Sequence, residues 1–333
     1  MRFSLTPDTL FQTRQARLNA DLRARLQTVG QEAITGRRSD QVQATSGRLG
    51  DAFLLEKAAL DITRQRDTAN LASARLDGAA SSVSTIRTIL TSFAPESRNT
   101  LAQGQPSDIA LLGEKASDTL QQVMGALSRR QGTRHLFSGT HTVGGPLAVP
   151  ADLMTAVNAQ IAAAPNATDA ITAVNDYFNI AGGGFETDIY QGSVEEGPRL
   201  HVTDTRSYDP LPKGDDPIFR DIMRGFAMIA GAENAVTTTD RDALMEEGLA
   251  VLDTALSGVL AMESRLGSAQ ESIERIDTSL QTEAALVSSA LDKMLGRDVF
   301  DAAAELQALE GQLEASYTVT GRLGSLSLAN FLR

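Results

Sequence analysis

The stretch VLDTALSGVLAMESRLGSAQESIERIDTSL, residues 251–280, decides the fold. Small or apolar residues recur there at alternating steps of three and four: Leu252, Ala255, Val259, Met262, Leu266, Ala269, Ile273, Ile276 and Leu280. This spacing has the 3.5-residue period of a coiled-coil-like seam, which keeps one helix face against a partner. We therefore predict a long helix that is capped at its start by Thr239 or Asp240.

The first half of the chain carries a matching pattern. The same steps run over residues 62–90, and Pro95 is expected to end that helix because proline disrupts a helix interior. A second helix is predicted from Ser107 to about Gly132. Two seams of this length predict a coiled-coil-like helical bundle.

Both ends of the chain are also amphipathic. Near the N-terminus one face carries Leu18, Leu22, Leu26, Val29 and Ala33, and Gly36 is expected to end the helix. Past Gly296 a last seam carries Val299, Ala302, Leu306, Leu309, Leu313, Ser316, Thr320 and Leu323. A pair of terminal helices buries little surface, so the stripe has two open interpretations: a self-assembly surface, or a terminus docked within one chain.

The middle of the chain differs in kind. Residues 143–217 hold seven of the ten prolines, a run of three glycines and short strand-like alternation near residues 199–202. We expect a small α+β or β-rich insertion with one helix near 151–163. The predicted fold is mainly α, with terminal helices over 1–40 and 297–333, a helical bundle over 41–142 and 218–296, and the insertion over 143–217.

Composition excludes several functions. A net charge of −12 disfavours binding to nucleic acid. The absence of cysteine removes disulfides, thiolate catalysis and Cys-ligated metals. No run approaches the ~18 apolar residues of a membrane helix, and the first residues lack the apolar core of a secretory signal peptide. We expect no nucleic-acid partner and no membrane span.

Candidate chemical sites are weak. His135, His141 and His201 lack the spacing of metal ligands on a helix face, and local hydrogen bonding is the expected role. The Asp215-Asp216 pair before a proline indicates a charged turn, and the triple glycine at 182–184 a flexible joint. We therefore expect no catalytic residue, cofactor or metal, and a protein that is not an enzyme.

Five segments resemble motifs of one known family. They are residues 1–4 (MRFS), 31–38 (QEAITGRR), 134–142 (RHLFSGTHT), 190–193 (YQGS) and 317–333 (YTVTGRLGSLSLANFLR). In their sequences and their order along the chain, these segments resemble the flagellin family. Within that family they resemble the branch of hook-associated protein 3, the hook–filament junction proteins.

The resemblance implies a structural subunit of the bacterial flagellum. It implies export through the flagellar type III apparatus with a cytoplasmic chaperone, an extracellular location, and assembly into a ring between hook-associated protein 1 and flagellin. The assembly interface expected on the terminal helices comprises Leu18, Leu22, Leu26, Val299, Leu306, Leu309, Leu313, Tyr317, Leu323, Leu326, Leu328 and Phe331. Two alternatives stay open: a filament flagellin, and a cytoplasmic coiled-coil scaffold.

Overall fold

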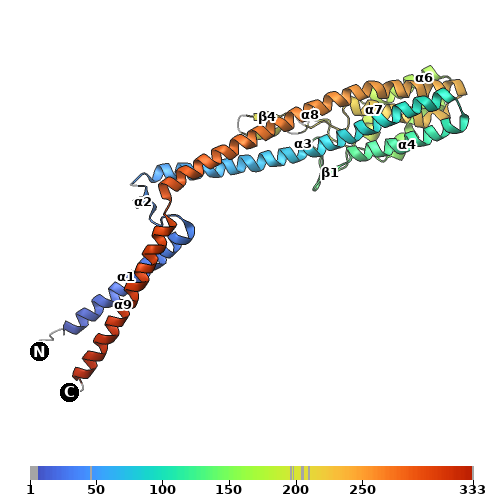
Figure 1. Ribbon diagram of the computed structural model, residues 1–333. Helices are drawn as coiled ribbons and strands as arrows, with labels where there is room; N and C mark the ends of the chain where they lie inside the picture. Colours follow the sequence, from blue (N-terminus) through green and yellow to red (C-terminus); the bar gives the residue numbers. More distant parts are fainter. Residues whose placement is uncertain are drawn as a thin grey trace. The chain divides into compact units, whose positions relative to one another are not determined.

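The computed structural model of the chain is shown in Figure 1 and describes residues 7–45, 47–195, 197, 199–203, 206–208 and 211–331. Side chains at 7–12, 43, 200–203, 206, 208 and 323–331 are outside that description. The chain divides into two compact units. The first unit joins Met1–Arg64 to Leu280–Arg333, and the second unit is Gln65–Ser279.

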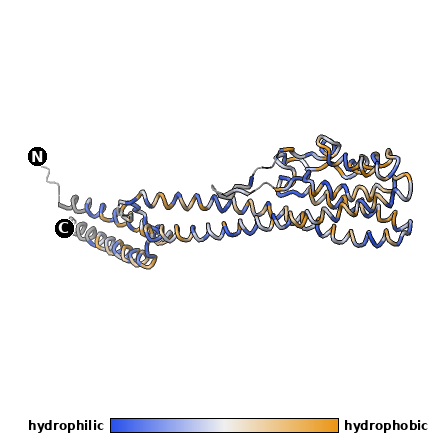
Figure 2. Tube along the Cα trace, turned by 90° about the horizontal axis from the view of Figure 1, so that it is seen from above, coloured by the Kyte–Doolittle hydropathy of each residue, from blue (hydrophilic) through white to orange (hydrophobic). Residues whose placement is uncertain are grey.

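Two long helices, α3 (Leu49–Gln103) and α8 (Thr238–Leu295), form the frame of the second unit. The two helices run antiparallel. Ion pairs join Arg66 to Asp277 at 3.0 Å and Arg87 to Glu263 at 3.0 Å, so residue numbers rise along one helix where they fall along the other. Figure 2 shows hydrophobic residues recurring along both helices. The predicted seams are buried from Ala69 to Leu90 and from Leu252 to Leu280, with Ala269 half-buried.

The prediction that Pro95 ends the first of these helices is wrong. α3 continues through Pro95 to Gln103. Phe93 and Ser97, on either side of the proline, are buried. Phe93 packs edge-to-face on Phe226 with ring centroids 4.9 Å apart, and the Ser97 hydroxyl donates to the Phe93 carbonyl at 2.7 Å. Pro95 itself is exposed, so water can reach the carbonyl that lost its partner. Packing here outweighs the local cost of proline.

Two helix boundaries also differ from expectation. α8 begins at Thr238, and its cap is Thr237, whose hydroxyl accepts from the Asp240 amide at 3.1 Å and donates to the Asp240 carboxylate at 2.6 Å. α4 (Pro106–Leu127) stops before Gly132, because β1 (Arg130–Gln131) and β2 (Arg134–His135) form an antiparallel hairpin. Gly132 lies in its turn with φ of 59°.

The middle segment is more helical than expected. The helix expected near 151–163 is present as α5 (Pro150–Ala163), but α6 (Ala167–Asn179) was not predicted. A π-helical turn follows (Phe185–Ile189), and the strands reduce to one hairpin of β3 (Leu200–Thr203) and β4 (Arg206–Tyr208). Helices α5 and α6 pack on each other and on α7 (Pro217–Gly231), which continues into a short 3-10 turn (Ala232–Asn234). The segment therefore belongs to the same compact unit as the bundle.

Residues 134–142 and 190–193, two of the motif segments, lie against each other in the second unit. Phe137 and Ser138 are fully buried, and the Ser138 carbonyl accepts from the Ser193 amide at 3.1 Å. The Tyr190 hydroxyl donates to the Ser193 carbonyl at 3.1 Å, and the Phe137 ring meets Phe219 edge-to-face at 5.7 Å. These motif residues hold loops together rather than forming a reactive site.

The mainly α fold class is confirmed. In the first unit, α1 (Pro7–Thr35), the single turn α2 (Gln41–Ala44) and α9 (Val299–Phe331) join the ends of α3 and α8. Within the described part of the chain, no helix combines the length and apolarity that crossing a bilayer requires.

Candidate assembly surface

Helices α1 and α9 lie side by side in the first unit (Figure 1). The centre of the pair is a cluster of buried Val29, Ala302 and Leu309. Four partly buried residues surround it: Leu22, Leu26, Ala33 and Leu306. The two stripes recognised in the sequence thus face each other within one chain.

A polar layer continues the pair beyond the apolar cluster. Ser316 is 9% exposed, and its hydroxyl accepts from Gln15 Nε2 at 3.0 Å and donates to Asn19 Oδ1 at 2.5 Å. One position further along α9, the Tyr317 hydroxyl accepts from Arg23 Nε at 2.8 Å, and the guanidinium lies 5.5 Å from the Tyr317 ring centroid. The buried contact of Ser316 helps to fix the register of the two helices, because a shift would leave its hydroxyl unsatisfied.

The segment that follows α1 and the segment that precedes α9 are joined by backbone hydrogen bonds. We call these segments, residues 36–38 and 295–297, the clamp. Gly36 ends α1 with φ of 65°, a left-handed conformation that glycine adopts readily. Its carbonyl accepts from the Arg297 amide at 2.9 Å, and the Arg38 amide donates to the Leu295 carbonyl at 2.8 Å. The exit of one helix and the entry of the other are therefore held together by backbone bonds.

A buried carboxylate completes the clamp. Glu32 is 6% exposed, its Oε1 accepts from the Ser39 amide at 2.8 Å, and its Oε2 lies 3.4 Å from an Arg297 guanidinium nitrogen. Arg297 also pairs with Glu305. A buried charge without a partner is costly, so this contact favours one arrangement of the two breaks.

The structure separates the predicted interface residues into three groups. Leu309 is buried, and Leu22, Leu26, Leu306 and Leu313 are half-buried. Leu18, Val299 and Tyr317 are 53%, 50% and 43% exposed. The side chains of Leu323, Leu326, Leu328 and Phe331 lie outside the description. Pairing within the chain therefore uses much of the stripe, and contact with other subunits through it stays a prediction.

Sequence reasoning missed Glu32 and Arg297. Their shared signal is position: each charged residue lies within four residues of a glycine that follows a long amphipathic helix. A charge that close to such a helix break is a candidate for pairing across the break.

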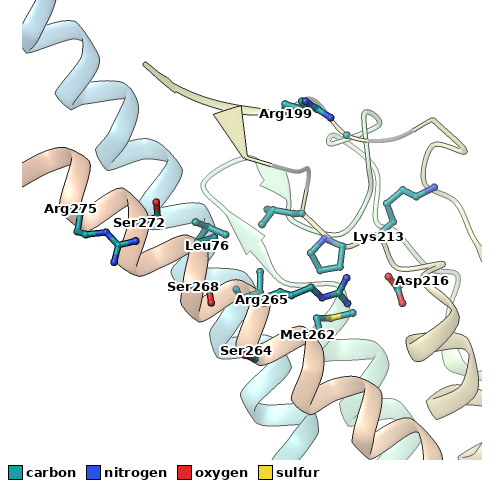
Figure 3. Close-up of a pocket in the computed structure, with 15 residues that line it drawn as sticks. Leu76, Arg199, Lys213, Asp216, Met262, Ser264, Arg265, Ser268, Ser272 and Arg275 are labelled. Atoms are coloured by element: carbon teal, nitrogen blue, oxygen red, sulfur yellow. The ribbon is translucent and has the colours of Figure 1, made fainter. Parts of the chain in front are cut away.

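The second unit carries a groove of about 940 Å³ beside α8 (Figure 3). The charged residues of its lining are mainly basic, and Figure 3 shows Arg265 and Lys213 near Asp216. Asp216 caps α7 by accepting from the Ile218 amide at 3.0 Å, and burial raises the pKa of its carboxyl. Asp215 lies 3.3 Å from the Lys213 amine. The aspartate pair is thus a charged turn, as predicted.

The other sequence candidates also have structural roles. His135 Nδ1 lies 2.9 Å from the Ser128 carbonyl, the local bond that was expected, whereas the His201 side chain lies outside the description. The triple glycine is a tight turn rather than a flexible joint. A Cβ on Gly183 would lie 2.7 Å from the Ile180 carbonyl, and one on Gly184 2.1 Å from the Tyr177 ring. No group of three metal-ligating side chains occurs among the described residues.

Comparison with known proteins adds a further observation. Residues 249–332 match the family described as the bacterial flagellin C-terminal helical region. This part of the chain is similar to flagellin. The matched residues comprise most of α8 and all of α9, and so include the second helix of the terminal pair and its half of the clamp. No curated protein sequence matches the chain.

Two solved structures are similar at low identity. Bacillus cereus FlgL has 13% identity and a TM-score of 0.42, over 75% of this chain and 99% of that one. A structure described as a flagellar hook-associated protein from Vibrio parahaemolyticus has 13% identity and a TM-score of 0.39, over 72% and 91%. At these values neither structure says anything further about function.

Proposed function

We propose that this chain is a structural subunit of the bacterial flagellum that joins the hook to the flagellin filament. The observation that carries the proposal is the flagellin-like region at residues 249–332, whose last helix pairs with the first helix of the chain. In the proposed assembly, the paired terminal helices and the helical bundle of one copy would each lie beside those of the next copy.

The junction role rests on the motif segments. Residues 134–142 and 190–193 resemble motifs of junction proteins, and their mutual packing gives a structural reason for both to occur. In this role the chain leaves the cell through the flagellar type III apparatus with a cytoplasmic chaperone. Outside the cell it forms a ring between hook-associated protein 1 and the first flagellin.

A deletion strain tests the junction role. Loss of the gene should leave hooks, remove filaments and release flagellin into the medium, and the full-length chain should restore filaments. A strain that keeps its filaments refutes the proposal.

The C-terminal similarity is to flagellins as a whole, so filament flagellin is the second candidate. In that case the deletion strain would lack both filaments and secreted flagellin. A coiled-coil scaffold, in contrast, would stay in the cell when filaments are sheared off.

A further inference from the structure

Two adjoining grooves of the second unit gather positive charge in an acidic chain. One is the groove of about 940 Å³ beside α8, and the other, of about 410 Å³, lies between α3 and the β1–β2 hairpin. Both are lined by Gly197 and Leu211, so they meet at the segment that carries these residues. Among the described lining residues, one is acidic, Asp216, and six are lysine or arginine: Arg75, Arg134, Arg199, Lys213, Arg265 and Arg275. The whole chain has 42 acidic and 30 basic residues, so its average composition does not account for this excess.

Three of these arginines can accept an external anion. Within the described part of the chain, the guanidinium groups of Arg75 and Arg134 have no ion pair or hydrogen bond. Arg265 is exposed, and the carboxylate whose charge it stabilises, that of Asp216, already caps α7. Several other arginines of the second unit pair with carboxylates of the chain: Arg66, Arg87, Arg220 and Arg224.

Two further cations of the grooves have partners in the chain. Lys213 lies 3.3 Å from Asp215 and donates to the Val194 carbonyl at 2.9 Å. Arg275 pairs with Glu271 on the same helix, and the two side chains are 63% and 70% exposed. A pair this exposed is weak and leaves the guanidinium available to a second anion. The positive charge open to a ligand therefore lies on α3, the hairpin and α8.

The spacing of polar groups along α8 suits an extended polypeptide. Ser264, Ser268 and Ser272 line the larger groove at successive turns, about 6 Å apart along the helix. Side chains on one side of an extended chain repeat every two residues, about 6.6 Å. The serine hydroxyls can therefore bond to successive polar groups of such a chain. Arg265 and Arg275 are about 15 Å apart along the helix, close to the ~13 Å between residues four apart in an extended chain.

The apolar part of the lining suits aliphatic side chains. Leu76, Met262 and Leu266 are buried side chains that line the larger groove, and half-buried Leu211 and Pro212 line it as well. The described linings contain no Phe, Tyr or Trp on which nucleotide bases could stack. A ligand with carboxylate and aliphatic side chains therefore fits these grooves better than a nucleic acid does.

We propose that the two grooves bind an extended acidic segment of another protein, in which carboxylate and aliphatic side chains alternate. Figure 3 shows the charges of the larger groove on both of its sides: Arg265 and Arg275 lie on α8, and Arg199 and Lys213 on the facing segment. The described non-helical segments of this chain carry no alternation of carboxylates, so the occupant comes from a different protein. The site lies wholly in the second unit.

Fluorescence anisotropy with a labelled peptide tests the proposal. The probe is an octapeptide of alternating glutamate and leucine, added to the full-length protein at low salt. We expect saturable binding that weakens as salt rises, because exposed charges are screened. An octapeptide of alternating glutamine and leucine has the same shape without the charge and should bind about tenfold more weakly.

The variants address each groove. Arg134→Gln combined with Arg265→Gln removes one exposed cation from each groove and should weaken binding of the glutamate peptide about tenfold. Ser268→Glu places a carboxylate at an exposed position of the larger groove and should weaken binding similarly. The matched control is Arg98→Gln, because Arg98 belongs to the same unit, pairs with Asp253 and lines neither groove. It should leave the affinity unchanged.

Several results would overturn the proposal. Equal binding of the glutamine peptide would mean that charge is not recognised, and unchanged affinity in both groove variants would mean that the peptide binds elsewhere. An equal loss in Arg98→Gln would mean that only net charge matters. Tighter binding of a sulfated heparin oligosaccharide, with the same dependence on Arg134 and Arg265, would assign the grooves to a polysaccharide. Self-association that the peptide displaces would assign them to a second copy.

The deletion strain tests the junction role separately. Filament formation in that strain does not depend on the anisotropy measurements, so the failure of one proposal leaves the other standing.

Discussion

Replacing Glu32 by glutamine removes the charge that holds the clamp and little else. Glutamine keeps the size of the side chain and an oxygen that can accept from the Ser39 amide, so the lost contact is the one to Arg297 at 3.4 Å. A hydrogen bond to a charged group contributes about 1.5–3 kcal/mol. The Arg297 side chain is 21% exposed and keeps Glu305, which places the expected loss at the lower end, about 1.5–2 kcal/mol.

Amide hydrogen exchange measures this loss where it occurs. The amides of Arg38 and Arg297 donate to the Leu295 and Gly36 carbonyls, so they exchange only when the clamp opens. A loss of about 1.5–2 kcal/mol should speed their exchange roughly 10- to 30-fold. Amides inside the second unit should keep their rates, because the clamp lies wholly in the first unit.

The matched control is Glu310→Gln, which removes an exposed carboxylate from the same helix as Glu305. It should leave both clamp amides unchanged. Unaltered exchange of these amides in Glu32→Gln would show that backbone bonds alone hold the clamp. An equal rise throughout the molecule would show that Glu32 acts on global stability, and either result refutes the argument.

Three further predictions concern stability, measured as the free energy of unfolding. Leu309→Ala should destabilise the α1–α9 pair by about 2–4 kcal/mol, because this side chain is 5% exposed. Val299→Ala replaces a side chain that is 50% exposed and should cost under about 0.5 kcal/mol. Equal effects of the two variants on denaturation followed by helix content would contradict the pairing. Gly225→Ala should cost about 1–3 kcal/mol, since a Cβ there would lie 2.9 Å from the Gly248 carbonyl. In Gly125→Ala the new Cβ has no atom within 4 Å, so this variant should be neutral or stabilising. Urea denaturation that ranks the two variants in the opposite order would refute the close α7–α8 contact. The backbone amide of Gly182 and then Arg220 lower the pKa of Glu186. The ionised carboxylate therefore stabilises the fold above the ordinary glutamate pKa, and this stabilisation is lost as pH falls through the lowered pKa. Glu186→Gln should lose less stability than wild type between about pH 5 and pH 3, and parallel pH profiles would contradict this.

The helices with long seams could be predicted from the sequence because periodicity reports which face is buried. The stripes from Leu252 to Leu280 and from Ala302 to Ser316 face their partners as expected. Helix α6 was missed because Thr and Asn residues dilute its stripe of Ala170, Val174 and Phe178. Its start is capped by the Asn166 side chain, which accepts from the Asp169 amide at 3.0 Å, and the Ala167 amide donates to the Asp240 carboxylate at 2.8 Å. Periodicity carries no information about such a cap.

The candidate surface was less accessible to sequence reasoning. A stripe indicates that a face is buried, but it does not say whether the partner lies in the same chain or in another copy. Leu309 is buried by α1, yet Val299, on the same predicted stripe, is half exposed. The contact of Glu32 with Arg297 joins residues that no helical period relates. Tertiary structure alone brings them together.

The pairing of α1 with α9 sets an order for folding. Gln15 and Ser316, which bond across the pair, are 301 positions apart in the chain. Closing a flexible loop of that length has a high entropic cost, whereas contacts within Gln65–Ser279 span shorter loops. Once that middle segment has folded, its two ends are no longer free to diffuse apart, and the remaining closure costs less. Helix α1 therefore pairs only once α9 is present. In a polypeptide that ends before residue 299, the apolar stripe of α1 lacks the helix that covers it.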